Sequence, residues 1–128
     1  MTSAGGAMDP RLVEVAHACF DFARDGDAAR LGTYVDQGVP VNLTDSSGNT
    51  LLMLVAYHGQ AAVVTALLER GADVNRLNDR GQSPLAGAVF KGEDTIVWLL
   101  LDAGADVEAG SPSARETAQM FGRGDLIP

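Results

Sequence analysis

Apolar residues recur along this chain at the spacing of helices that bury one face. In residues 60–70 the aliphatic side chains lie at i, i+1, i+4 and i+5, on a single helical face. They are Val63, Val64, Leu67 and Leu68. The pattern predicts a helix over 60–70 that ends at Gly71, because glycine readily adopts the positive φ found just past a helix end. An apolar run over residues 50–58 predicts a shorter preceding helix, which Gly59 interrupts.

The same pattern returns along the chain at a constant offset of 33. Glycines mark this period in three series, which are Gly26, Gly59 and Gly92, then Gly38, Gly71 and Gly104, then Gly48 and Gly81. Ten of the 28 positions in residues 48–75 are identical to those in 81–108, whereas unrelated segments share about two. The identities are glycines at breaks and aliphatic residues at helical spacing, with an Ala-Asp-Val sequence after the second break. We therefore interpret the chain as a stacked array of repeated helical units.

Each unit has two predicted helices followed by a polar loop. The third unit repeats the second, with helices over 83–91 and 93–103. The first unit begins at Asp9 and Pro10, an N-cap followed by proline at the first helical position, and its first helix runs to about Arg24. The last unit, from about Ser111, keeps only its first helix. Atypical units are expected at the ends of a stacked array.

The repeated residues resemble the ankyrin repeat. The resemblance rests on Gly48-Asn-Thr-Leu-Leu, the inter-helix glycine, the Leu-Leu pair and Gly71-Ala-Asp-Val-Asn75. The third unit has the corresponding Gly81-Gln-Ser-Pro-Leu85, Gly92, Leu100-Leu101 and Gly104-Ala-Asp-Val107. It implies an all-α ankyrin-repeat solenoid of about four stacked helix–turn–helix units with turn-like loops. We expect repeats over about 9–44, 45–77 and 78–110, a partial cap over 111–128 and a flexible leader over 1–8. The style resembles the short ankyrin proteins of bacteria.

One position departs from the family pattern. The family's Thr-Pro-Leu-His stretch is Thr50-Leu-Leu-Met53 in the second unit and Ser83-Pro-Leu-Ala86 in the third. The family's histidine is absent from both units, together with the hydrogen bonds between loops that it normally supports. We expect Met53 and Ala86 to pack among apolar groups instead.

Charge and composition narrow the possible partners. The net charge is −8, with nine basic residues against seventeen acidic ones, so the chain lacks the cations that binding to nucleic acid or an anionic membrane requires. No apolar stretch approaches the ~20 residues that span a bilayer. The first seven residues have no basic run or apolar region of a secretory signal. A single cysteine, Cys19, allows no internal disulfide. We expect a cytoplasmic monomer.

The resemblance implies a scaffold that binds other proteins through the loop tips and the ends of the first helices. When the family's contact positions are carried over to the equivalent positions of each unit, they predict a partner-binding surface. It is made of Arg24, Ser46, Ser47, Asn49, Tyr57, His58, Asp79, Arg80, Gln82, Phe90, Lys91, Arg115 and Arg123. The same register adds Asp25 at a helix end and places Ala114 at the tip glycine of the last unit, between Pro112, Ser113 and Arg115.

Two properties of this surface indicate how it binds. Tyr57 and Phe90 are equivalent positions of successive units, and they either form a stacked pair on the surface or lie in the core. Five of the nine basic residues fall on the surface but only two of the seventeen acidic ones, Asp25 and Asp79. We therefore expect a basic and aromatic face that binds a protein with an acidic surface.

The sequence offers no catalytic, metal or cofactor site, and we predict that the protein is not an enzyme. His17 and Cys19 are two residues apart on a helix, about 200° around its axis, so they point in different directions. Cys19 aligns with Leu52 and Leu85 and is expected in the core. The glycines match no phosphate-binding motif. Two alternatives to a simple binding module remain: an accessory or inhibitory subunit of an enzyme, and a self-associating structural protein.

Overall fold

The computed structural model describes residues 10–128, and within this range the chain is entirely helical apart from turns and one isolated bridge. The first helix is helical from the first described residue, Pro10, and ends at Asp25, next to the predicted Arg24, whereas the predicted N-cap Asp9 and the predicted leader lie outside the described residues. The helices in chain order are α1 (Pro10–Asp25), α2 (Ala28–Asp36), α3 (Leu51–Tyr57), α4 (Ala61–Glu69), α5 (Pro84–Lys91), α6 (Asp94–Asp102), α7 (Ala114–Met120) and the 3-10 helix η2 (Gly124–Leu126).

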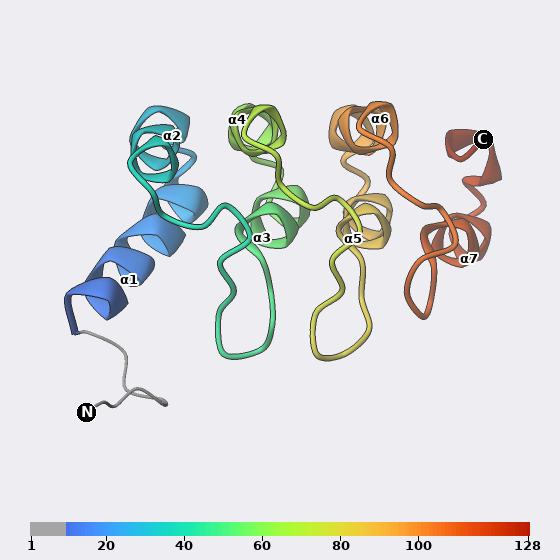
Figure 1. Cartoon of the computed structure of the whole chain (residues 1–128). Coiled ribbons are helices and arrows are strands. Elements are labelled where there is room, and N and C mark those ends of the chain that lie inside the picture. The colour runs from blue at the N-terminus through green and yellow to red at the C-terminus, as the bar shows by residue number, and fades with distance from the viewer. Residues whose placement is uncertain (1–9) are drawn as a thin grey trace.

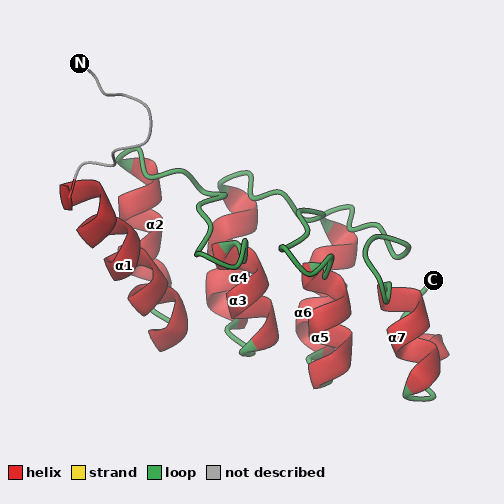
Figure 2. Cartoon of the chain, turned by 90° about the horizontal axis from the view of Figure 1, so that it is seen from below, coloured by secondary structure: helices red, strands yellow, loops and turns green. Residues whose placement is uncertain are grey.

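The helices form two parallel rows (Figure 1). Helices α1, α3, α5 and α7 pack against one another in order along one row, and α2, α4 and α6 form the other. The first helix of each of the first three units also packs against the second helix of its own unit. The loops that precede α3, α5 and α7 extend away from the second row, and the view from below shows them along the same side of the array (Figure 2). This arrangement is the predicted all-α solenoid.

Helices α3, α5 and α7 each begin at a buried hydroxyl side chain. The N-cap residues are Thr50, Ser83 and Ser113, and each side-chain oxygen accepts the backbone N–H three residues later at 3.1 Å. These bonds satisfy an amide that has no partner within the helix itself. The N-caps therefore define the register of the repeats directly. The spacing from Thr50 to Ser83 equals the predicted period.

Glycines end the helices where the sequence predicts it. Gly92 caps α5 in the left-handed region with φ 71°, and Gly71 follows α4 with φ 85°. Side chains are strained at such angles, so glycine is the residue that turns the chain at low cost.

The core consists of the aliphatic residues that the periodicity identified. Leu67 and Leu100, equivalent in α4 and α6, have no exposed surface. Cys19 is likewise fully buried, as are Leu52 and Leu85 to within 1%, which confirms that Cys19 lies in the core as expected. Met53 and Ala86 are buried as expected.

Adjacent units are also joined by hydrogen bonds that repeat with the period. The side-chain oxygen of Asn42 accepts the N–H of Asp73 at 2.8 Å, and that of Asn75 accepts the N–H of Asp106 at 2.8 Å. At the loop tips, the N–H of Asp79 donates to the carbonyl of Ser47 at 3.0 Å. These bonds fix the position of each loop relative to the next one.

The last unit departs from the predicted register. Its N-cap Ser113 follows Ser83 at a spacing of 30 instead of 33, because the loop between α6 and α7 is shorter by three positions than the loop between α4 and α5. Ala114 is consequently the buried first residue of α7 and is not the equivalent of the tip glycine. The expectation that this unit keeps only its first helix also needs correction, since η2 packs against α7 and buries Leu126.

Candidate protein-binding groove

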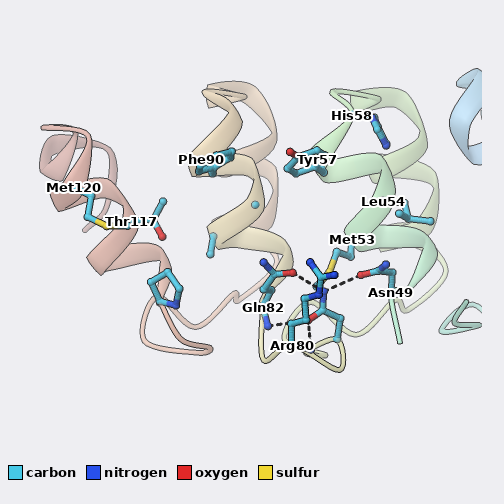
Figure 3. A pocket seen from close by; sticks show the side chains of 14 residues that line it. Asn49, Met53, Leu54, Tyr57, His58, Arg80, Gln82, Phe90, Thr117 and Met120 are labelled. Atoms are coloured by element: carbon cyan, nitrogen blue, oxygen red, sulfur yellow. Dashed lines mark hydrogen bonds between the residues drawn. The ribbon is translucent and has the colours of Figure 1, made fainter. Parts of the chain in front are cut away.

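The row formed by α1, α3, α5 and α7 is the inner row of the array. A groove of about 590 Å³ lies along it, between α3, α5, α7 and the loop tips that precede them. Six of the predicted surface residues line it: Asn49, Tyr57, His58, Arg80, Gln82 and Phe90. The tip residues lie at one end and the aromatic pair at the other (Figure 3). The structure thus brings the predicted loop positions and helix-end positions together into one concave site.

The two aromatic residues lie on the surface of the groove. Tyr57 is 39% exposed and Phe90 is 55% exposed. Their ring centroids are 6.4 Å apart and the planes differ by 11°. Of the two arrangements that the sequence left open, the structure therefore shows the stacked surface pair. His58 adds an edge contact to Tyr57, with centroids 5.5 Å apart.

The row continues into the last unit through residues that the sequence analysis missed. At the spacing of 30, the helix-end pair of α7 is Met120 and Phe121, which are 64% and 53% exposed. Phe121 contacts the ring of Phe90 edge-on, with centroids 5.5 Å apart. A signal for this register was present, because Ser113 and Glu116 have the spacing of a capping box and form one in the structure.

The predicted cations separate into two groups. Arg24, Arg115 and Arg123 make ion pairs, with Asp21, with Glu108 at 2.7 Å and with Asp94 at 3.0 Å respectively. None of the three lines the groove. Arg123, predicted as a helix-end position, instead follows Gly122 and donates to Asp94, and this hydrogen bond raises the pKa of Arg123 above its ordinary value.

Arg80 and Lys91 behave differently, since neither forms an ion pair within residues 10–128. Arg80 lines the groove at the tip before α5. Lys91, at the far end of α5, has its ammonium group 5.0 Å from the ring centroid of Tyr57. Contact of this kind holds a cation near an aromatic face without neutralising it. Two unneutralised cations are thus held at opposite ends of the groove.

No carboxylate of the described chain lines the groove. Asp79, on the same tip as Arg80, has its carboxylate against Gly48 of the preceding tip, where a Cβ would lie 2.4 Å from Oδ1. In a protein of net charge −8, a groove edged by cations and free of described acidic side chains is a local reversal of the overall charge.

The tips at the groove are held by a side-chain network. Asn78 donates to the side-chain oxygens of Asn49 and Gln82, at 2.9 and 2.8 Å. The carbonyl oxygen of its own side chain accepts the N–H groups of Arg80 and Gln82, both at 3.0 Å. The network links two consecutive tips and fixes their position relative to each other.

The remaining predicted tip positions differ in exposure. Ser46, Ser47 and Asp79 are all exposed, and all three lie outside the lining of the groove. Pro112 lines the groove, but Ser113 is buried as the N-cap of α7. The expectation that Ser113 lies on the tip surface was wrong, because the shorter loop moves it into the helix start.

The cysteine and histidine weighed as a metal site in the sequence do not form one in the structure. Cys19 is buried, and burial raises the pKa of its thiol, whereas His17 on the same helix is exposed. Among the described residues, no three His, Cys, Asp or Glu side chains are grouped as a metal site would require. None of the helices in residues 10–128 has both the length and the hydropathy needed to cross a bilayer.

Helix pairs stacked at a constant period and a groove along the inner row define a helical repeat protein with a concave face. The family model for ankyrin repeats, in three copies, matches residues 19–111. The chain therefore belongs to the ankyrin repeat family, whose repeats generally mediate protein–protein interaction and are generally not enzymes.

The chain is also similar to a protein of Pseudomonas aeruginosa that is named as an ankyrin repeat protein. The two are 45% identical over 52 residues. The matched segment covers 41% of this chain and 30% of the relative, so the similarity spans less than a third of the relative's length.

Proposed function

We propose that this protein is a non-enzymatic binding module that holds an acidic partner protein in the groove along α3, α5 and α7. The observation that carries the proposal is the composition of the groove. It combines exposed stacked aromatic rings with two unneutralised cations and no lining carboxylate from residues 10–128. Aromatic and arginine side chains surrounded by polar groups are the residues that most often dominate binding energy at protein interfaces.

The proposed site is narrower than the surface expected from the sequence. It keeps Tyr57, His58, Arg80, Phe90 and Lys91, since these side chains lie in or beside the groove. The ion-paired arginines and the exposed tip serines are proposed as its rim. An extended or helical segment of the partner can contact all three inner helices at once. We further propose that the protein acts as a cytoplasmic monomer and that residues 9–128 form one repeat domain.

An affinity capture with matched variants tests this function. The binding variant combines Tyr57→Ala, Arg80→Glu and Phe90→Ala. The control combines Trp98→Ala with Arg76→Glu, because Trp98 is as exposed as Phe90 and Arg76 also makes no ion pair in the described chain, yet neither lines the groove. We expect an acidic protein to be retained by the wild type and the control and lost by the binding variant.

Other results would separate the alternatives. Equal capture by all three proteins would contradict the groove as the binding site. Loss of an enzyme activity in the lysate on addition of the wild type, but not of the binding variant, would identify an inhibitory subunit that uses the same groove. Size-exclusion chromatography at several concentrations measures whether the protein is a monomer. An apparent mass that increases with protein concentration would favour the self-associating alternative.

A further inference from the structure

Two glycines lie inside α-helices of the described chain, and only one of them has a packing reason. A Cβ on Gly32 would lie 2.8 Å from Nη2 of Arg70, so the guanidinium that pairs with Asp36 fills the space a side chain needs. Gly87 has ordinary helical backbone, and a Cβ there would meet only Tyr57, at 3.7 Å, which is normal van der Waals contact. Glycine destabilises a helix interior relative to alanine. Neither backbone nor packing therefore accounts for Gly87.

Gly87 lies on the floor of the groove beside Ala86. The equivalent residues of α3 are Met53 and Leu54, and the equivalent of Gly87 in α7 is Thr117 at the shorter spacing of the last unit. At the position of Gly87 the middle helix thus has no side chain, whereas both of its neighbours have one. The missing side chain leaves a notch on α5 beside Tyr57, whose ring carbon Cδ1 is the neighbour that a Cβ at Gly87 would meet.

The two unneutralised cations stand at opposite ends of this notch. Helix α5 has eight residues and is therefore about 12 Å long. Arg80 precedes it at the tip, and Lys91 is its last residue, held over the ring of Tyr57. Figure 3 shows Arg80 at the tip end of the groove, and Tyr57 and Phe90 at the other end.

We propose that the notch over Ala86 and Gly87 receives one large apolar side chain of an extended acidic peptide segment, whose carboxylates pair with Arg80 and Lys91. The inference rests on the proposed function and names the partner chemistry of the same groove. An extended chain advances about 3.3 Å per residue, so two carboxylates about four residues apart reach both cations. The peptide pattern that the groove would bind is therefore an apolar residue between two acidic ones.

Each feature of the proposed peptide pattern is complementary to a property of the groove. The apolar side chain packs against buried Met53 and the exposed parts of the Tyr57 and Phe90 rings, and is thereby removed from water. The carboxylates neutralise cations that have no ion-pair partner in the described chain. A basic segment would be repelled at both ends, and a segment without an anchor would leave the notch unfilled. The groove therefore selects by charge spacing and by one anchor side chain.

A phage-displayed library of random peptides tests the pattern directly. Peptides of about twelve residues are long enough to exceed the length of the groove at ~3.3 Å per residue. Selection on the whole chain is expected to enrich sequences in which a large apolar residue lies between Asp or Glu residues about four positions apart. Enrichment of basic sequences, of sequences without an apolar anchor, or of no sequence at all would overturn the proposal.

Variants then locate the bound peptides by fluorescence anisotropy. Gly87→Leu introduces the residue that α3 has at the equivalent Leu54, and it is expected to weaken binding about tenfold by filling the notch. Arg80→Glu should weaken binding by at least as much, while Trp98→Ala and Arg76→Glu leave it unchanged. Thermal unfolding checks that each variant is folded. Gly87→Ala, which adds one methyl group at ordinary contact distance, replaces Gly87→Leu if the larger residue unfolds the helix.

The outcomes distinguish this inference from the proposed function. If Gly87→Leu or its replacement binds like the wild type while the Tyr57, Arg80 and Phe90 triple variant does not, the notch is wrong and the groove stands as the binding site. If the selected peptides are insensitive to both variants, the groove and the notch are both wrong.

Discussion

Tyr57 and Phe90 occupy the same position in successive repeats, and their rings lie 6.4 Å apart and nearly parallel on the surface of the groove. The relationship follows from the period, because the last turn of α3 lies beside the last turn of α5. Phe121 extends the row into the next unit by contact with Phe90. Rigid aromatic side chains of this kind bury much area on binding while losing little conformational entropy.

Phe90→Ala should weaken partner or peptide binding by about 2 kcal/mol, the loss typical of an interface anchor. The same change should lower the free energy of unfolding by only about 1 kcal/mol, because the ring is 55% exposed and loses its aromatic contacts alone. Isothermal titration and urea unfolding measure the two effects. Trp98→Ala removes an equally exposed ring from α6 and should leave binding intact. Equal losses of binding in both variants would argue against a localised site.

The two helical glycines should respond to alanine in opposite directions. Gly87→Ala should raise the free energy of unfolding by about 0.5–1 kcal/mol, since the new Cβ has room and removes the helix cost of glycine. Gly32→Ala should lower it, because the Cβ would meet the guanidinium of Arg70 at 2.8 Å and disturb its ion pair with Asp36. Urea unfolding of both variants measures the sign. Destabilisation by Gly87→Ala would show that the glycine has a structural role.

The asparagine bonds between units should contribute equally at both sites. Asn42→Ala and Asn75→Ala each remove a 2.8 Å acceptor for the backbone of the next unit. Each variant should lose about 1 kcal/mol of stability, the usual net contribution of one hydrogen bond. Chemical denaturation followed by circular dichroism measures the loss, and the exposed Thr65→Ala on α4 serves as a control with little effect. A change below experimental error in both asparagine variants would show that these bonds do not stabilise the stack.

Cys19 should be unreactive in the folded protein. Its side chain is fully buried and its thiol pKa is raised by burial, so little thiolate is available to a thiol reagent at neutral pH. Ellman's reagent should therefore react slowly with the native protein and quickly after unfolding in urea. Rapid reaction in native buffer would indicate that α1 opens locally.

The raised pKa of Cys19 also predicts the direction of a pH effect. The unfolded chain releases the thiol proton at lower pH than the folded one, so the stabilisation is present below the ordinary thiol pKa and is lost as pH rises through the folded value. Comparison of the wild type with Cys19→Ala in alkaline urea titrations isolates this contribution from that of other groups. A parallel decline in both proteins would exclude the contribution of Cys19.

Most of the fold could be predicted from the sequence because its signals are local. Glycine tolerates a positive φ, and a hydroxyl before an apolar run caps a helix, whatever the rest of the chain does. Thr50 and Ser83 therefore reveal the register independently of tertiary contacts. The equivalence of Tyr57 and Phe90 followed from the same period. The last unit was misplaced because the spacing of 33 was extended to it, whereas its own cap, Ser113, shows 30.

The sequence by itself determined the repeat, the two-helix unit, the core positions and the equivalence of Tyr57 and Phe90, since each is carried by local signals that return at a fixed spacing. Only the tertiary structure decided which cations stay unneutralised. Arg123 is paired with Asp94 of the preceding unit, while Arg80 has no such neighbour in the described chain. It also decided the shape of the groove, because the notch at Gly87 lies beside Tyr57 of the preceding helix. Both properties arise from side chains that different repeats bring together, and no single repeat contains them.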